Sequence, residues 1–316
     1  MEQTLSFVDK YRPNDLKDIV LSNYLKKKLN TIINQKSIPN LLVTGSQSVG
    51  KTSIINIICK KIYDGKNYED YILELNASDD RGLNIINSTI IPFCKKKLDL
   101  QKIIILDEAD SITSKAQYLL SNVISKYTNT SFIFICIDKF KIFDSIQSRC
   151  IILNIDSLSN RNIKNIIIDI CSKEKIKVNT DDLDVFILIS DNNIRQCINN
   201  LECFKFSNIE LNKDNINYLF NKPKINLIQK IFESSIKKNL KKSITLLLEL
   251  YKEGYNNIDI ISSMIQYIQT NMLNIDEEQR IKIYSLLSQC YIKINEGNDS
   301  ELQIYNCICQ IYKLNF

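Results

Sequence analysis

The sequence of 316 residues contains no histidine, and it has only six glycines and four prolines. Without histidine the chain cannot carry out Ser-His or Cys-His nucleophilic catalysis, and it lacks the usual general base at neutral pH. The ten cysteines are scattered without a C-x-x-C pair, so the sequence also predicts no zinc site. We expect these cysteines to be reduced thiols in the core. Any catalysis must depend on carboxylates, lysine, arginine and a bound metal ion.

Long apolar runs are also absent. No uncharged apolar stretch approaches the ~20 residues that a membrane-spanning helix needs, and the first residues lack the apolar segment of a secretory signal. Hydrophobic residues make up 44% and charged residues 24%, which is ordinary for a globular protein. The net charge of +5 is too small to indicate nucleic-acid binding by itself, because such binding depends on local basic patches. We therefore expect an intracellular protein without membrane contact.

Short apolar runs alternate with amphipathic stretches between residues 41 and 155. The runs are LLVTG, YILEL, KIIILDEAD, FIFICI and IILNI, and stretches such as SIINIICKKIY lie between them. Apolar runs of this length favour buried strands, and their alternation with helical stretches is typical of a parallel α/β sheet. The sequence therefore predicts an α/β domain over residues 1–155.

Beyond residue 155 the pattern becomes helical. The segments NRNIKNIIIDICSKEKI and IRQCINNLECFKF carry apolar residues at helical spacing, and strand-like runs disappear. Pro223 then interrupts the chain, and the remaining sequence is again helical. We expect a small helical domain over residues 156–221 and a second all-helical domain over residues 222–316.

The segment GSQSVGKT, residues 45–52, fits the phosphate-loop pattern G-x-x-x-x-G-K-[ST]. Gly45 and Gly50 let the backbone curl so that N–H groups face phosphate oxygens, and the helix that follows adds its partial positive charge. Lys51 would reach the β- and γ-phosphates of ATP, and Thr52 would hold Mg²⁺. A chance match is the alternative, but a strand precedes the loop and a helix follows it. The expected nucleotide contacts are Gly45, Ser46, Gln47, Ser48, Val49, Gly50, Lys51, Thr52 and Ser53.

A second element, IIILDEAD at residues 103–110, ends an apolar run in two carboxylates. This is the usual form of a Walker B strand, in which Asp107 would reach Mg²⁺ and Glu108 would polarise the attacking water. An Asp-Glu pair after a strand could instead be only a helix N-cap, but the phosphate loop upstream weakens that reading. The letters DEAD do not indicate an RNA helicase, because the chain shows neither a second helicase domain nor its Ser-Ala-Thr motif.

Four further motifs resemble the small subunits of replication factor C, the sliding-clamp loader of eukaryotes and archaea. FVDKYRP at 7–13 is similar to the family's opening motif, an aromatic residue followed by V-E-K-Y-R-P. ELNASDDRG follows at 74–82, IQSRC at 146–150 and NNIRQCINNL at 192–201. The motifs occur in the family's order from Phe7 to Leu201. Beyond Leu201 only helical character and Pro223 support the resemblance.

The resemblance implies an AAA+ ATPase domain, a helical lid and a helical collar through which five subunits associate. Arg149 of the S-R-C motif would be an arginine finger that stabilises charge in a neighbouring subunit's site. A surface arginine in an ordinary salt bridge is the alternative for this residue. Arg195 in the lid would contact the γ-phosphate in its own subunit, as sensor 2. Tyr11, Arg12 and Pro13 would pack near the adenine.

Two departures from the family concern the ATPase site. The residues Ser46, Gln47 and Ser48 replace the Pro-Pro-Gly of the usual phosphate loop, at positions that tolerate change. Ile137 stands where the family has the sensor 1 asparagine, which helps to orient the hydrolytic water. Hydrolysis in this subunit's own site is therefore expected to be slow.

Other departures concern DNA. Asn87 and Ile91 stand where the family has basic residues directed to DNA phosphates. Ser121 and Asn122 likewise stand where the family has a pair of arginines. Contact through Arg81 and a helix N-terminus remains, and we expect it to be weaker in each subunit. The lysine runs at 26–28 and 95–97 could follow a phosphate backbone, although solvated helix faces are the alternative.

The segment IIPFCKKKL, residues 90–98, suggests the clamp contact. Pro92 cannot continue a helical hydrogen-bond ladder, so the sequence predicts that the chain turns outward and exposes Ile91 and Phe93. Such a pair would suit a hydrophobic groove on the clamp. The alternative is that Phe93 packs under the sheet.

Our interpretation is a clamp-loader small subunit that binds ATP and Mg²⁺ and joins other clamp-loader subunits in a pentamer. It would help to place a sliding clamp of the proliferating cell nuclear antigen type on primer-template DNA, in the nucleus or at another site of DNA replication. A structural subunit that binds nucleotide without hydrolysing it, and lends Arg149 to a neighbour, is the main alternative, which Ile137 favours. Intact Lys51, Asp107, Glu108 and Arg195 favour an active site. An AAA+ protein that loads another machine, such as a helicase, fits the other motifs poorly.

Overall fold

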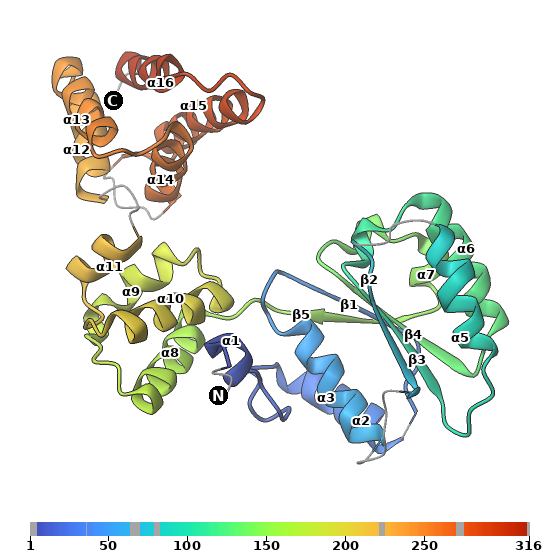
Figure 1. Ribbon diagram of the computed structural model, residues 1–316. Coiled ribbons are helices and arrows are strands. Elements are labelled where there is room, and N and C mark those ends of the chain that lie inside the picture. Colours follow the sequence, from blue (N-terminus) through green and yellow to red (C-terminus); the bar gives the residue numbers. More distant parts are fainter. Residues whose placement is uncertain are drawn as a thin grey trace. The chain divides into compact units, whose positions relative to one another are not determined.

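The computed structural model describes residues 5–35, 37–63, 70–78, 83–220, 225–269 and 275–314. The chain divides into two compact units, Met1–Leu211 and Asn212–Phe316. The first unit combines a parallel sheet with helices, and the second is helical (Figure 1). Across these described ranges, no helix has the length and apolar character that a membrane span requires.

A parallel sheet forms the centre of the first unit. Its strands are β1 (Leu41–Gly45), β2 (Ile72–Asn76), β3 (Lys102–Asp107), β4 (Thr130–Cys136) and β5 (Ile151–Ile155). They lie in the order β2-β3-β4-β1-β5, and every neighbouring pair is parallel. The predicted α/β fold is confirmed, and each predicted apolar run forms a strand. The carboxyl ends of all these strands meet at one edge of the sheet, where open α/β sheets bind ligands.

Helices cover both faces of the sheet. The elements before and after the strands are α1 (Phe7–Lys10), α2 (Asn23–Asn34), α3 (Lys51–Tyr63), α4 (Leu83–Ile85), the π-helical turn η2 (Ile86–Ile90), α5 (Ile91–Lys95), η3 (Ala109–Ser111), α6 (Ser114–Lys126), η4 (Lys139–Lys141) and α7 (Asp144–Gln147). In Figure 1, α2 and α3 lie on one face, and α5, α6 and α7 lie on the other.

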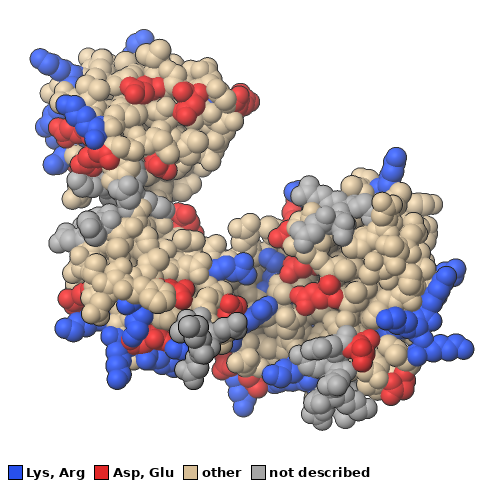
Figure 2. All heavy atoms as spheres, viewed as in Figure 1, with Lys and Arg blue, Asp and Glu red and all other residues tan. Residues whose placement is uncertain are grey.

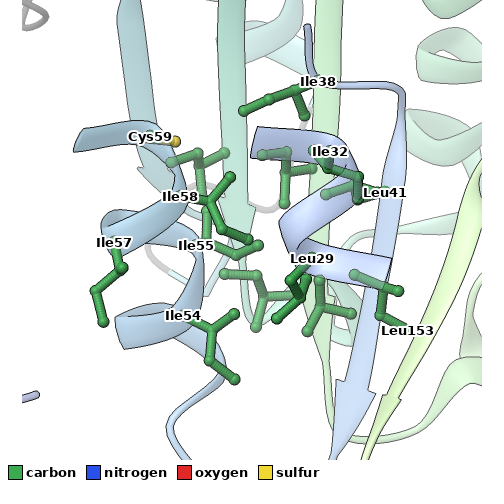
Figure 3. Packing of buried hydrophobic residues seen from close by; sticks show 14 of the residues in the cluster. Leu29, Ile32, Ile38, Leu41, Ile54, Ile55, Ile57, Ile58, Cys59 and Leu153 are labelled. Carbon is green, nitrogen blue, oxygen red and sulfur yellow. The ribbon is translucent and has the colours of Figure 1, made fainter. Parts of the chain in front are cut away.

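The two faces have separate apolar cores because successive side chains of a strand point in opposite directions. In β1, Leu41 and Val43 join the cluster beneath α2 and α3, whereas Leu42 joins the cluster beneath α5 and α6. Figure 3 shows Ile54, Ile55 and other residues of α3 packed into the first of these clusters. A sheet that is covered on both faces accounts for the nearly continuous apolar runs of its strands.

A small helical region ends the first unit. It contains α8 (Asn160–Glu174), η5 (Thr180–Asp182), α9 (Leu183–Ile189) and α10 (Ile194–Ser207), and an isolated bridge joins Val178 to Leu211. The side chains of Ser159 and Asn193 cap the N-termini of α8 and α10 by accepting hydrogen bonds from backbone N–H groups. This region is helical, as predicted, and we refer to α8 to α10 as the lid.

The second unit is built from helices alone in its described part. They are α11 (Lys213–Phe220), α12 (Ile225–Ile236), α13 (Leu240–Lys252), α14 (Asn257–Gln269), α15 (Glu277–Asn295) and α16 (Glu301–Lys313). One apolar cluster, which includes Phe232, Leu247 and Ile308, joins α12 to α16. Large apolar side chains remain exposed on α15, among them Ile281 and Ile292. The helical C-terminal part is confirmed.

Candidate nucleotide site

The phosphate-loop segment turns sharply between β1 and α3. Gly50 has φ +90°, and Ser48 has φ 61°, so both residues lie in the left-handed region that favours glycine. A Cβ atom on Gly45 would lie 2.5 Å from the carbonyl oxygen of Ile155 on the neighbouring strand. Because that oxygen belongs to the backbone, only glycine fits at position 45 without a shift of the sheet. The two glycines thus allow the sharp turn between β1 and α3.

Lys51 begins α3 and folds back over this loop. Its ammonium donates hydrogen bonds to the carbonyl oxygens of Gly45, at 2.8 Å, and Ser46, at 2.7 Å. Burial lowers the pKa of the Lys51 ammonium, and the charge of Asp107 opposes that shift. The guanidinium of Arg195 also acts on this ammonium in the lowering direction, so the lid arginine lies within electrostatic range of the loop. Charges on both Asp107 and Arg195 thus act on the Lys51 ammonium, and the roles that the motifs predict for these three residues stay predictions.

Thr52 and Asp107 lie side by side at the carboxyl edge of the sheet. The hydroxyl of Thr52 donates to Oδ2 of Asp107 across 2.8 Å. The other carboxylate oxygen, Oδ1, accepts a hydrogen bond from the backbone N–H of Glu108 at 2.9 Å. Hydroxyl and carboxylate oxygens are the ligands that Mg²⁺ prefers, and one or two protein oxygens with substrate phosphates suffice to bind it. The donor set therefore fits Mg²⁺ bound together with a nucleotide.

Glu108 follows Asp107 in an unusual backbone conformation. Its φ is 52°, in the left-handed region, and its side chain is exposed at the edge of the sheet. A left-handed conformation at a non-glycine residue costs energy and is frequent at functional sites. The exposed Glu108 side chain thus differs in its surroundings from the Asp107 carboxylate, which accepts a hydrogen bond from Thr52.

Asp110, which the sequence reasoning gave no role, organises the neighbouring loop after β4. Its Oδ2 accepts hydrogen bonds from the backbone N–H groups of Ile137, at 3.3 Å, and Asp138, at 3.4 Å. The hydroxyl of Thr44 donates to the carbonyl of Ile137 at 3.0 Å. Both peptide groups of Ile137 are thereby fixed, while its side chain is 47% exposed. A polar residue inside the DEAD segment was the only signal in the sequence for this contact.

The side chain of Gln117 supports the same loop and uses both of its N–H donors to do so. Its amide donates to the carbonyls of Ile112, at 3.2 Å, and Lys141, at 2.9 Å, and its Oε1 accepts from the N–H of Phe143 at 2.8 Å. The residue is buried. Gln117 therefore joins the segments around Ile112, Lys141 and Phe143 and holds this loop in place.

The segment Tyr11-Arg12-Pro13 lies between the lid and the phosphate-loop helix. The Tyr11 hydroxyl donates to Glu174 of α8 at 2.5 Å, and burial together with this carboxylate raises the pKa of Tyr11 to about 12. Nε of Arg12 donates to the Ser53 hydroxyl at 3.3 Å. Thus Arg12 is joined to the predicted nucleotide contact Ser53, whereas the Tyr11 hydroxyl is directed to the lid.

Arg149 lies away from these residues, at the opposite edge of the sheet. It precedes β5, whose first residue pairs with Leu41 at the start of β1, while the phosphate loop follows the last residue of β1. Its Nε donates to the Ser125 hydroxyl at 3.0 Å, and its guanidinium also bonds the Ser145 carbonyl. The side chain is exposed. One strand length, about 3.3 Å per residue, separates this arginine from the phosphate loop of its own chain.

The prediction that Phe93 and Ile91 are exposed is wrong. Phe93 is only 7% exposed and belongs to the core beneath β3 and β4, and Ile91 packs against the same cluster. Pro92 does not turn the chain outward. The π-helical turn η2 runs directly into α5, and Pro92 occupies the first turn of α5, where a missing N–H group is tolerated.

The motif ASDDRG lies partly outside the described residues, since these do not include 79–82 and thus not Arg81. Asn87 is exposed on η2, whereas Ser121 is buried and donates to the Tyr118 carbonyl. The lysine run 95–97 borders a hollow of about 750 Å³ at the amino edge of the sheet. On the face seen in Figure 2, basic side chains are interspersed with acidic ones, without one continuous basic stripe.

The parallel sheet, the phosphate loop and the paired Thr52 and Asp107 define a P-loop ATPase domain of the AAA+ class. Three family profiles match the chain in succession: the AAA family of ATPases associated with various cellular activities at residues 41–156, an AAA+ lid domain of the RFC1-like type at 160–217, and the replication factor C C-terminal domain at 223–310. The chain belongs to the replication factor C small-subunit family.

Relatives match the chain over nearly its whole length. It is 34% identical to replication factor C subunit 4 of Saccharomyces cerevisiae, with 100% of this chain and 99% of that protein covered. It is 32% identical to replication factor C subunit 4 of Schizosaccharomyces pombe, over 98% of this chain and 91% of the other. The replication factor C small subunit of Aeropyrum pernix is 29% identical, with 94% of this chain and 93% of that protein covered.

A solved structure supports the fold independently. The Thermotoga maritima RuvB Holliday junction branch migration motor aligns with a TM-score of 0.55 at 16% identity, covering 72% of this chain and 79% of the other. At this low identity the likeness concerns the fold alone.

Proposed function

We propose that the chain is a small subunit of a clamp loader, which uses ATP binding and hydrolysis to place a sliding clamp on primer-template DNA. The observation that carries the nucleotide part is the pairing of Thr52 with Asp107 at 2.8 Å beside the Lys51 ammonium. Family membership supports the role in replication. The domains would be the ATPase at 1–155, the lid at 156–221 and the collar at 222–316.

The contacts around the phosphate loop support a role for each site residue. Lys51 would exchange its two carbonyl partners for the β- and γ-phosphates, and the loop N–H groups would surround the remaining oxygens. Thr52 and Asp107 would hold Mg²⁺. When bound, the ion would neutralise charge on the phosphate oxygens. Glu108 would orient and polarise the attacking water from its separate, exposed position, and Arg195 would contact the γ-phosphate from the lid.

The position of Arg149 supports a role in a neighbouring subunit. Its exposed side chain lies at the amino edge of the sheet, whereas the phosphate loop lies at the carboxyl edge. An arginine at this distance cannot stabilise charge in its own site, but it can do so for an adjacent copy of the fold in a ring. Association in a pentamer with other clamp-loader subunits would bring it there, and the exposed apolar side chains of α15 suit contacts in the collar.

A second function has one observation in its favour. Ile137 presents an exposed aliphatic side chain at the position where the family places its water-orienting asparagine, and both N–H donors of the nearby Gln117 bond backbone carbonyls. A subunit that binds ATP without hydrolysing it, and supplies Arg149 to its neighbour, would retain every other feature of the site. Measurement of hydrolysis in the assembled complex separates this function from the first.

The test of the proposal begins with the assembly. Affinity purification of the full chain from its own cells, followed by identification of bound proteins, should recover other replication factor C subunits. The purified complex should load a clamp of the proliferating cell nuclear antigen type onto primed circular DNA only when ATP is present, and Lys51→Ala should reduce loading. Recovery of the chain without any such subunit, or loading that proceeds without ATP, would contradict the proposal.

A further inference from the structure

The N-terminal segment 7–13, which we call the strap, is bonded to the lid. The backbone N–H of Phe7 donates to Oε1 of Glu202 on α10 at 3.2 Å, and the Phe7 ring is buried. Both Lys10 and Tyr11 donate to Oε1 of Glu174 on α8 at 2.5 Å. Figure 1 shows α1 beside α8 and α10. The strap is thus held by two separate helices of the lid.

Glu174 is the hub of these contacts. It is the last residue of α8 and only 8% exposed, although it carries a carboxylate. Lys205 of α10 donates to its backbone carbonyl at 2.6 Å and places its ammonium 3.9 Å from Oε2. The hydrogen bonds from Lys10 and Tyr11 hold the pKa of Glu174 below its usual value, so the carboxylate is charged at neutral pH. A buried charge of this kind persists only where several partners satisfy it.

The strap also reaches the phosphate-loop helix. Arg12 donates to the Ser53 hydroxyl, one residue beyond Thr52, and Asp15, two residues after the strap, pairs with Lys61 near the end of α3 at 3.0 Å. The segment from Lys10 to Arg12 therefore joins Glu174 in the lid to the helix that carries Lys51 and Thr52.

The residues of α10 that contact the strap and Glu174 lie on the same face of this helix as Arg195. Arg195 and Glu202 are seven residues apart, about two helical turns, so they lie on one side of the helix. Lys205, three residues further, continues that face toward Glu174. Because a helix moves as a rigid rod, a rotation of the lid about the strap would displace Arg195 relative to the phosphate loop.

We propose that Glu174 is a positioning residue that fixes the lid, by way of the strap, so that Arg195 lies over the phosphate loop. This inference rests on the proposed function of the nucleotide site. Its consequence is specific: Glu174 sets how well the site distinguishes ATP from ADP. Only ATP carries the γ-phosphate that Arg195 would contact, so a lid that is no longer fixed should lose affinity for ATP and keep its affinity for ADP.

A double-mutant cycle on the full chain tests this. Affinities for ATP and ADP are measured by competition against a fluorescent nucleotide for the parent, Glu174→Ala, Arg195→Ala and the double variant. Each single variant should lower the ratio of ATP affinity to ADP affinity on the order of 5- to 30-fold, the factor that corresponds to one or two kcal/mol. The double variant should lower it no further than Arg195→Ala does, because Glu174 acts through Arg195.

The ratio of ATP affinity to ADP affinity distinguishes a displaced Arg195 from a general loss of folded protein. A partly unfolded sample lowers both apparent affinities by the same fraction and leaves their ratio unchanged. Should Glu174→Ala fail to fold, Glu174→Gln and Tyr11→Phe are the milder variants: the first keeps an oxygen for the Tyr11 hydroxyl but loses the charge, and the second removes only that hydroxyl. Asp184→Asn, which removes a 67% exposed lid carboxylate paired with Lys164, is the matched control and should keep the parental ratio.

The outcomes distinguish the inference from the function on which it rests. If Arg195→Ala changes the ratio and the Glu174 and Tyr11 variants do not, or if the losses in the double variant add, Glu174 has no positioning role. If Arg195→Ala leaves the ratio unchanged, the assignment of Arg195 to the γ-phosphate is wrong, and with it the basis of the inference.

Discussion

The hydroxyl of Thr52 lies 2.8 Å from Oδ2 of Asp107, although the two residues are 55 positions apart in the chain. Strand order accounts for this meeting. β1, which leads to Thr52, and β3, which ends at Asp107, both flank β4, so their carboxyl ends lie close together at one edge of the sheet. The pair is the structural basis for the proposal that Mg²⁺ and a nucleotide bind at this edge.

Replacement of Phe93 tests its place in the core. Phe93→Ala should lower the free energy of unfolding by about 3–5 kcal/mol, because it removes a buried ring and leaves a cavity beneath β3 and β4. Urea denaturation of the full chain measures the change. Leu98→Ala, at a more exposed position shortly after α5, is the control and should cost far less. If Phe93→Ala were as stable as the parent, the Phe93 ring would not be part of the core.

Loss of Arg149 should affect the assembly and not the isolated chain. Arg149→Ala should leave this subunit's own ATP affinity unchanged and lower the turnover of the site it serves in the assembled complex, by a factor of ~10³–10⁵ for a complete finger. Arg161→Ala, at an exposed arginine on α8, is the control and should keep full turnover. Weaker ATP binding by the isolated Arg149→Ala chain would rule out a role in a neighbouring site.

A polar residue at position 137 should accelerate hydrolysis. The backbone of Ile137 is fixed by Asp110 and Thr44, and its side chain is half exposed, so Ile137→Asn should fold normally and place an amide beside the site. Single-turnover hydrolysis in the complex should rise while ATP affinity remains nearly constant. Ile137→Leu provides an apolar control. An unchanged rate for Ile137→Asn would show that water orientation at this position does not limit the reaction.

The charge of Glu174 predicts a dependence of stability on pH. Its pKa in the folded chain is lowered by hydrogen bonds from Lys10 and Tyr11, so its contribution is fully present above the unfolded value of about 4.3 and is lost as the pH falls through the lower folded value. The difference in unfolding free energy between the parent and Glu174→Gln should therefore shrink on acidification across that interval. A difference that stays constant from neutral to acid pH would show that the carboxylate is not held in its charged form.

The sheet could be predicted from the sequence because its signals are local. Each strand is a short apolar run, buried on both faces, and the glycines and lysine of the phosphate loop have fixed spacing. The pairing of Thr52 with Asp107 then follows from the parallel fold, in which the carboxyl ends of strands share an edge.

The contacts of Glu174 and the burial of Phe93 could not be predicted in this way. Glu174 gains its role from partners more than 160 residues earlier in the chain, and nothing in the sequence around it marks it out from other acidic helix ends. The prediction for Phe93 assumed that Pro92 interrupts an ordinary α-helix and turns the chain outward. Instead, the π-helical turn η2 precedes Pro92 and runs directly into α5, so the chain continues along the core. The contacts of Glu174 and the burial of Phe93 both arise from tertiary packing between segments that are distant in the sequence.

The central claim is that the loop around Lys51 binds ATP. Isothermal titration of the full chain with ATP in the presence of Mg²⁺ tests it directly, with Lys51→Ala as the variant and Lys60→Ala, at an exposed lysine of the same helix, as the control. The parent and Lys60→Ala should bind ATP with equal affinity, and Lys51→Ala should show no binding, because the phosphates would lose the one ammonium in the loop sequence. Equal affinity in Lys51→Ala, or no binding by the parent, would contradict the assignment of this site.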